Sequence, residues 1–213
     1  MGGLAALYEA AAYIIGMVFL ILVVDYSAVV DPIQKVALLA ENQTLMYIMT
    51  LVIYVAFGIF LVVLALALFE RLKAGAPAMA QTATAFGLIW AGLVIAAGMI
   101  FNIGMGTVVG LYGTDPAQAA TVWLAIEAVF EGIGGGNEIV GGLWVLLVAW
   151  AALRAGEFPR LLNYIGLLVG VAGILSAIPA LGEIGGAIFG LGQIVWFVWI
   201  GIDLLRTDAS AIA

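Results

Sequence analysis

The side chains of this sequence best suited to chemistry are carboxylates that fall within or beside long apolar stretches. They are Asp25, Glu127, Glu131, Glu138 and Glu183. An acid is costly to bury inside a membrane, so its presence there points to a function by default. Glu127 and Glu131 stand four residues apart and share one face of a helix, where two negative charges would favour capture of a proton or a cation. The five acids therefore predict proton or cation handling, and the alternative for the Glu127 pair is an amphipathic helix whose acidic side faces water.

Structural explanations also exist for the other acids. Asp25 could reach out to the membrane surface from the end of its span. Asn137 and Glu138 suit the cap and the first turn of a helix, where the helix dipole favours an acid. Glu183 stands near the start of the last apolar stretch and could be stabilised in the same way. We expect Glu9, close to the amino terminus, to lie among lipid headgroups.

Missing residue types restrict the chemistry further. The 213 residues include neither histidine nor cysteine, which removes imidazole and thiolate metal ligands and His-dependent catalytic triads. We therefore predict no metal site, no cofactor and no enzymatic activity. The glycine-rich stretch at 132–136 lacks the preceding strand and the lysine of a phosphate loop, so no nucleotide is expected. Six basic residues provide no electrostatic basis for binding nucleic acid.

Composition defines the class of protein that must position these acids. Hydrophobic residues make up 66% of the chain and charged residues 9%, whereas about a quarter of the residues in soluble proteins are charged. A helix needs about 20 mostly apolar residues to cross a lipid bilayer, so residues 1–213 are predicted to form one all-α transmembrane bundle. The six predicted spans cover 8–30, 45–70, 79–103, 137–154, 161–178 and 184–206. Residues 117–133 predict a further helix on the outer side that is interfacial, re-entrant or continuous with the fourth span.

The positions of the basic residues predict the orientation of the spans. Arg71 and Lys73 follow the second span, Arg154 and Arg160 flank the loop after the fourth, and Arg206 ends the sixth. Cytoplasmic loops carry the excess of Lys and Arg, so these loops and both termini are predicted to be cytoplasmic in a protein of the inner membrane. The net charge of −7 then falls on the outer side. That side would attract cations or a basic partner, unless it is simply a solvated acidic rim.

Two Asp-Pro pairs predict helix starts in the outer loops. Asp31-Pro32 and Asp115-Pro116 each combine a capping carboxylate with a proline at the first helical position, where its missing N–H is not needed. We therefore expect a short amphipathic helix after Asp31 and the longer outer helix after Asp115.

Small and polar residues predict how the spans pack. Glycines at four-residue spacing allow helix backbones to approach closely within lipid, and whether they meet a helix of the same chain or of a second protein is open. These glycines are Gly166, Gly170, Gly182, Gly186 and Gly190. The expected buried polar side chains are Gln193 and Asn102. The tryptophans expected at span ends or facing lipid, and not around a ligand, are Trp90, Trp144, Trp150, Trp196 and Trp199.

The loop after the fourth span resembles that of a known family. Its residues Arg154, Gly156, Pro159, Arg160 and Leu162 fit the pattern Arg-x-Gly-x-x-Pro-Arg-x-Leu-Gly, with Asn163 in place of the last glycine. This pattern is similar to that of a bacterial six-span membrane family catalogued as domain of unknown function 4386. The resemblance implies six spans and supplies neither a reaction nor a ligand.

Two functions are compatible with these features. The glycine faces, the short loops and the lack of a catalytic residue set favour a non-enzymatic accessory or structural subunit that packs with other membrane proteins or as a homo-oligomer. The alternative is a small proton- or cation-linked transporter or channel that uses the outer-side carboxylates.

Overall fold

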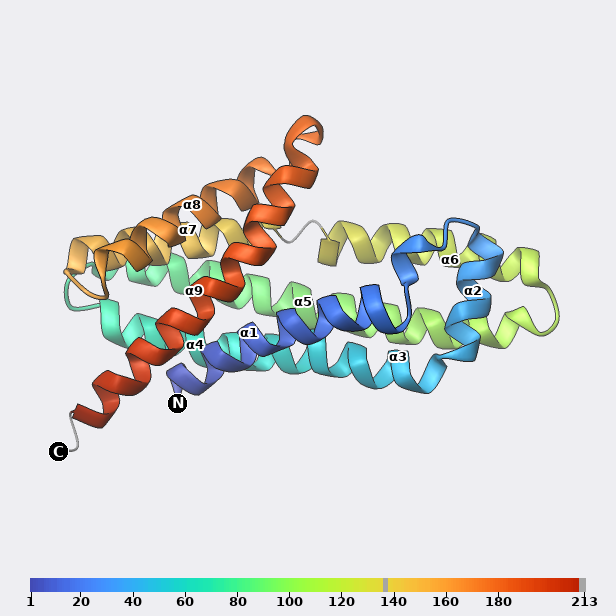
Figure 1. Ribbon diagram of the computed structural model, residues 1–213, viewed down its shortest axis with the longest axis horizontal. Helices are drawn as coiled ribbons and strands as arrows, with labels where there is room; N and C mark the ends of the chain where they lie inside the picture. Colours follow the sequence, from blue (N-terminus) through green and yellow to red (C-terminus); the bar gives the residue numbers. More distant parts are fainter. Residues whose placement is uncertain (136–137, 211–213) are drawn as a thin grey trace.

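The computed structural model describes residues 1–135 and 138–210, and every regular element in that part of the chain is a helix (Figure 1). The elements in chain order are α1 (Gly2–Val18), η1 (Phe19–Val23), η2 (Tyr26–Ala28), α2 (Pro32–Glu41), α3 (Gln43–Thr50), η3 (Leu51–Ala56), α4 (Phe57–Leu72), α5 (Pro77–Tyr112), α6 (Pro116–Phe130), η4 (Glu131–Gly135), α7 (Glu138–Ala155), α8 (Arg160–Leu175), η5 (Pro179–Leu181) and α9 (Gly182–Ser210). Three of the short elements, η1, η3 and η4, are π-helical, and η2 and η5 are 3₁₀ turns. The prediction of an all-α fold is confirmed for these residues.

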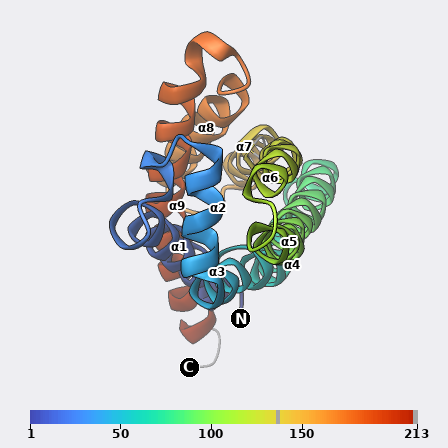
Figure 2. The same cartoon turned by 90° about the vertical axis from the view of Figure 1, so that its right-hand side faces the viewer.

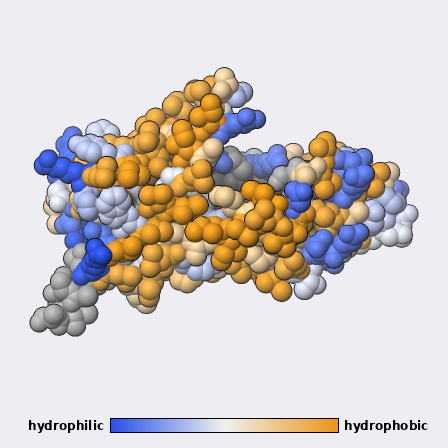
Figure 3. Space-filling model, viewed as in Figure 1, coloured by the Kyte–Doolittle hydropathy of each residue, from blue (hydrophilic) through white to orange (hydrophobic). Residues whose placement is uncertain are grey.

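Five helical segments are long and apolar enough to cross a membrane. They are Gly2–Val23, Gln43–Leu72, Pro77–Tyr112, Pro116–Ala155 and Pro179–Arg206, and Arg160–Leu175 is a shorter apolar helix. Large hydrophobic side chains cover much of the outer surface of these segments (Figure 3). A water-soluble protein rarely exposes so large an apolar surface, so the fold is that of a multi-pass membrane protein.

The local sequence determines where several helices begin. A carboxylate oxygen of Asp31 accepts a hydrogen bond from the backbone N–H of Gln34 at 2.9 Å, and Asp115 caps α6 through Gln118 at the same distance. Both predicted Asp-Pro helix starts are therefore confirmed. The predicted cap at Asn137 lies outside the described residues.

The longest helix, α5, sets the length of the molecule. It has 36 residues and is therefore about 54 Å long, well beyond the about 30 Å of hydrocarbon in a bilayer. The continuous α3–η3–α4 segment runs beside it, and α6 and α7 follow one another along it, each antiparallel to the part of α5 that it covers (Figures 1 and 2). The helix expected at 117–133 is thus α6, aligned with the bundle axis and in line with α7. Its depth relative to lipid stays a prediction.

The two loops that the basic residues mark meet at one end of the bundle. Arg71 at the end of α4 donates through Nε to a carboxylate oxygen of Glu157 at 2.7 Å, which joins the two loops that the basic residues mark. The same loops touch where a Cβ added to Gly75 would lie 2.6 Å from the Cα of Ala155. Both ends of the chain point toward this side of the bundle (Figure 1), because α1 and α9 pack in opposite directions.

Two hydrophobic clusters follow one another along the bundle. The larger lies among α1, α4, the first half of α5, α7, α8 and α9, and it contains Trp90, Trp144 and Trp196. The smaller lies among η1, α2, α3, the second half of α5 and α6, and it centres on Trp123 and Phe101. Hydrophilic residues show at both ends of the long axis and in smaller patches between them, such as the one at the top of the view, whereas hydrophobic residues cover most of the surface between the ends (Figure 3).

The predicted packing glycines of α8 lie in close helix contacts, whereas the predicted ones of α9 do not. A Cβ at Gly170 would lie 2.6 Å from the carbonyl oxygen of Gly142, and one at Gly166 would lie 2.7 Å from Nε1 of Trp196. At Gly182 the nearest atom would be 3.4 Å away, and at Gly186 and Gly190 no described atom lies within 4 Å. Gly186 and Gly190 therefore leave one face of α9 open, whereas Gly185 and Gly192 of the same helix pack closely against α8.

Candidate functional site

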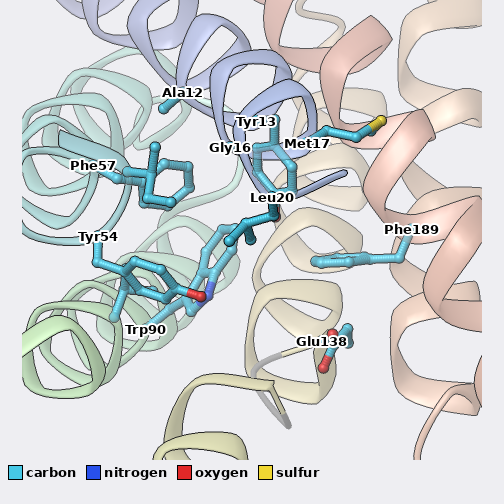
Figure 4. A pocket seen from close by; sticks show the side chains of 12 residues that line it. Ala12, Tyr13, Gly16, Met17, Leu20, Tyr54, Phe57, Trp90, Glu138 and Phe189 are labelled. Atoms are coloured by element: carbon cyan, nitrogen blue, oxygen red, sulfur yellow. The ribbon is translucent and has the colours of Figure 1, made fainter. Parts of the chain in front are cut away.

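A cavity of about 310 Å³ lies where α1, η3, α4, α5, α7 and α9 meet. Five aromatic residues and one acid line it, and the small residues Ala12 and Gly16 on α1 leave the space open. In Figure 4, Tyr54, Phe57 and Trp90 approach from one side, and Phe189 and Glu138 approach from the other. The ring of Tyr13 lies between them on α1. This is an apolar, aromatic space with a single charged group.

Irregular helix turns position the lining residues. Leu20 belongs to the π-helical turn η1, Tyr54 belongs to η3, and η4 ends just before the start of α7 at Glu138. A π-turn widens the helix and frees a carbonyl group, and such turns are frequent at functional sites. The hydroxyl of Tyr8 donates a hydrogen bond to the carbonyl of Val52 in η3 at 2.8 Å. Two of the three π-turns among the described residues, η1 and η3, thus contribute side chains to the cavity.

Glu138 is the acid of the cavity. It is half-buried in the first turn of α7, where the helix dipole stabilises a negative charge. The carbonyl oxygen of Glu138 lies 2.6 Å from the position of a Cβ added to Gly173, so α8 holds this turn in place. None of the ion pairs between side chains of the described residues includes Glu138. A carboxylate without a cationic partner beside aromatic faces is suited to bind a cation that has an apolar body.

A second, smaller cavity of about 60 Å³ adjoins the first. It shares Leu20, Ile53 and Tyr54 with the larger cavity, and it extends to Tyr26 and Phe130 in the second hydrophobic cluster. The two cavities therefore follow each other along the bundle axis, from Glu138 toward the end that carries α2 and α6.

A partly buried ion pair lies at the far end of the smaller cavity. Lys35 of α2 donates to Oε1 of Glu127 in α6 at 2.7 Å, and the side chains are 20% and 12% exposed. The hydroxyl of Tyr26 donates to the same oxygen at 2.8 Å and accepts from Nε1 of Trp123 at 3.0 Å. Tyr26 lies outside the five apolar segments; burial, followed by the bond to Glu127, raises the pKa of its hydroxyl, so that it remains a donor. The cluster ties η2 and α2 to α6.

The remaining acids predicted as site residues lie elsewhere. Asp25 is exposed in a left-handed turn with φ of 49°, and Glu131 is exposed in η4. Glu183 is exposed in the first turn of α9. The structure thus places Glu138 in the cavity and Glu127 in an ion pair, and it does not bring the five acids together. The described residues contain no group of three acids that could hold a metal ion.

The two predicted buried polar side chains differ in their partners. Asn102 is 2% exposed and its Nδ2 donates to the carbonyl of Tyr47 at 3.3 Å, but its Oδ1 has no partner among the described residues. Gln193 is 0% exposed, and neither of its amide atoms has one.

Two expectations from the sequence are wrong. Glu9 is 0% exposed inside the bundle, not among headgroups, because α1 packs along its length against α4 and α9. Trp90, Trp144 and Trp196 are buried, since facing glycines such as Gly87 and Gly166 make room for the last two indole rings. Trp150 is 45% exposed, as a lipid-facing residue should be.

Several residues of the site escaped the sequence analysis. Tyr13, Tyr54 and Phe189 belong to ordinary apolar stretches, and nothing in their spacing marks a cavity. The sequence did single out Lys35, because it is the one basic residue outside the regions predicted to be cytoplasmic, and a nearby acid was its expected partner. The helix pattern alone could not identify which acid.

These features define a class: a multi-pass α-helical membrane protein with an aromatic cavity inside its bundle. Within that class, the chain belongs to the family described as domain of unknown function DUF4386, whose model matches residues 7–202. The expected family is therefore confirmed. No curated protein and no solved structure matches the chain. The family description assigns no activity, so the function must be argued from the site.

We predict that the Lys35–Glu127 pair stabilises the fold and does not depend on a ligand. Lys35→Met or Glu127→Gln should each lower the free energy of unfolding by about 1–3 kcal/mol, because each leaves a partly buried polar group without its charged partner. The double variant should show a coupling energy of about 1 kcal/mol between the two sites. Chemical denaturation in mixed micelles measures these values. Glu131→Gln, the exposed control, should change stability by less than about 0.5 kcal/mol, and equal losses at Glu127 and Glu131 would contradict this role.

Proposed function

We propose that this protein is a non-enzymatic inner-membrane protein of six spans, with both termini in the cytoplasm, that binds and transports a small organic cation. The cavity beside Glu138 carries the proposal, because one carboxylate lies there among five aromatic rings and in none of the side-chain ion pairs of the described residues. This choice favours the transporter hypothesis over the accessory subunit.

The chemistry of the cavity selects the ligand class. A volume of about 310 Å³ is at the lower end of the range for ligand pockets, about 300–1,000 Å³, so the ligand must be small. A quaternary or tertiary ammonium group is attracted to aromatic faces by about 0.5–2 kcal/mol each, depending on desolvation. The carboxylate of Glu138 adds a direct charge interaction and repels anions. A neutral apolar molecule of the same shape would gain only from the rings.

Helix irregularity near the cavity supports transport over static binding. Transporters commonly place substrate sites beside interrupted helices near the middle of the membrane. Here η1 and η3 contribute residues to the lining, and a third π-turn, η4, ends α6 before α7 begins. These turns give α1, α4 and α7 a place to bend, which a cavity needs if it is to open alternately to the two sides.

The basic end of the bundle supports the proposed topology. Arg71, Lys73, Arg154 and Arg160 belong to two loops that touch each other, as expected for loops on the same side of a membrane. The shorter α8 has 16 residues and is about 24 Å long. A hydrocarbon layer of about 30 Å can thin locally around such a helix at modest cost. We therefore count α8 as the fifth of six spans, with α6 and α7 together forming the fourth crossing.

A second candidate function is an accessory subunit within a larger assembly. It is favoured by the open face of α9, where Gly186 and Gly190 have no described atom within 4 Å of an added Cβ. Small residues with open space beside them allow a second helix to approach closely in lipid. This candidate needs no cavity and makes a different prediction.

The topology predicts the labelling of single cysteines, which the cysteine-free chain makes simple to interpret. Ala74→Cys should react with a membrane-impermeant maleimide only after cells are opened, whereas Ala117→Cys and Ala180→Cys should react in intact cells. All three positions are exposed: Ala74 lies in the turn after α4, Ala117 in the first turn of α6, and Ala180 in the short helix η5 between α8 and α9. Protection of Ala180→Cys in intact cells would contradict α8 as a span, because α9 would then begin on the inner side or within the membrane.

The cavity predicts binding of benzyltrimethylammonium, a quaternary ammonium ion with one phenyl ring. Calorimetry in lipid nanodiscs should show that Glu138→Gln weakens binding by about 10- to 100-fold, the equivalent of losing about 1.5–3 kcal/mol from a charge-assisted contact. Glu183→Gln, an exposed acid on α9, is the matched control and should bind as the wild type does. Neopentylbenzene, the neutral carbon analogue, should not compete. Equal affinity of the two acid variants would contradict a site at Glu138.

The accessory-subunit candidate predicts an assembly that survives mild detergent. Native mass measurement should then detect a homo-oligomer or a complex with other membrane proteins, and Gly186→Ile with Gly190→Ile should disperse it. Gly92→Ile is the control, because Gly92 of α5 is also exposed with no atom within 4 Å of an added Cβ. A stable lone monomer in the wild type would remove this candidate.

A further inference from the structure

Six side-chain atoms of the described residues are buried without a hydrogen-bond partner. They belong to Glu9, Asn102, Trp144 and Gln193. Glu9 is the acid of this set, and both of its carboxyl oxygens lack a partner. Its side chain is 0% exposed. An acid in this position has no structural role as a cap, an ion pair or a surface charge, so its presence requires another explanation.

The position of Glu9 relates it to the cavity. Glu9 lies one helical turn before Ala12 and Tyr13, which line the cavity, so the three residues share one face of α1. On the neighbouring α9, Gln193 follows the cavity residue Phe189 by one turn in the same way. Glu9 and Gln193 thus lie one turn beyond the cavity on α1 and α9, toward the end of the bundle where α1 begins and α9 ends.

Among the described residues no cation is paired with Glu9, and the acid Glu138 acts electrostatically on the same neighbour, Tyr13, as Glu9 does. On α1 itself, Tyr8 and Tyr13 are the titratable groups within electrostatic range. The charged side chains described on the two helices that pack against α1 are Glu70 and Arg71 in the last turn of α4, Glu183 in the first turn of α9, and Asp203 and Arg206 farther along α9. The neighbouring turn η3 contributes Tyr54, and η1 contributes no titratable side chain.

Physical chemistry then determines the state of this acid. An ionised carboxylate in an apolar interior without a partner is too costly to persist, whereas a neutral carboxylic acid is tolerated. In the empty protein Glu9 therefore holds a proton. A cation in the cavity lowers the cost of a negative charge one turn away, because attraction between opposite charges is strong where water is excluded.

We infer that Glu9 is a proton-binding site linked to the cavity, so that entry of the organic cation releases the proton of Glu9 to water and loss of the cation restores it. The inference rests on the proposed function and deepens it, since it makes the protein a proton/organic-cation exchanger. The step balances: the O–H bond of the carboxylic acid breaks, the proton leaves to water, and the incoming cation supplies the compensating charge. By linkage, a bound proton weakens cation binding as much as a bound cation weakens proton binding.

Proton release during cation binding tests the inference. Wild-type protein in lipid nanodiscs is titrated with benzyltrimethylammonium in weakly buffered solution that contains a pH indicator. About one proton should be released per bound cation, and affinity should rise by up to about tenfold per pH unit where Glu9 is protonated. Glu9→Gln should bind the cation and release about one proton fewer per bound cation than the wild type, because glutamine keeps the shape of the protonated acid but has no acidic proton.

The outcomes separate this inference from the proposed function. If the wild type binds no cation, the proposed function fails, and the exchange fails with it. If the wild type binds and Glu9→Gln releases as many protons as the wild type, the inference alone is overturned. A measurement without ligand adds a second test: the infrared band of a protonated carboxylic acid should be lost in Glu9→Gln and kept in Glu183→Gln. Persistence of the full band in Glu9→Gln would also overturn the inference.

Discussion

The cost of a polar group in hydrocarbon is the constraint on which the structure depends. Within an apolar bundle, each charged side chain must be paired, neutral or beside a space that admits water or a ligand. The chain meets this requirement in three ways. Glu127 is paired with Lys35, Glu9 is buried alone in the position of a neutral acid, and Glu138 borders a cavity. The three acids therefore occupy three different environments within one bundle.

Helix packing decides where space remains for such a group. On α8, glycines bring the backbone against α7 so closely that an added Cβ at Gly170 would meet a carbonyl oxygen at 2.6 Å. Ala12 and Gly16 of α1 are also small, but the aromatic rings of the neighbouring helices do not fill the space beside them. Widened turns at η1 and η3 then move the neighbouring walls outward. Small residues therefore allow close helix contact at the α7–α8 interface, whereas at the cavity they leave space unfilled.

Much of the fold was predictable because it follows from local rules. Apolar run lengths predicted the long helices, and the Asp-Pro pairs at Asp31 and Asp115 predicted two helix starts that their side-chain bonds confirm. Contacts between residues far apart in the sequence were not predictable, because one helix face looks like another until the bundle is assembled. The π-turns gave no signal, since no residue type requires them. The in-line arrangement of α6 and α7 was one of three alternatives that the positive charges left open.

The candidate site was also predictable only in part. The sequence marked Glu138 and Glu127 as unusual, which was useful, but grouped them with Asp25, Glu131 and Glu183, which are exposed. It placed Glu9 at the membrane surface because nearness to a terminus usually means a wet environment. Depth depends instead on how far α1 packs between α4 and α9, which is a tertiary property. Aromatic residues were assigned to lipid on average tendencies, and the packing of Trp90 against the cavity overrode them.

The proposed function requires that the cavity beside Glu138 bind an organic cation. A crystal structure grown in a lipid phase with 4-bromobenzyltrimethylammonium tests it most directly, because bromine can be located by its anomalous scattering. We expect one strong bromine peak within the cavity, beside its aromatic rings, with the ammonium group toward Glu138. Bromine peaks confined to the exposed acids, with the cavity empty or filled by neighbouring side chains, would contradict it.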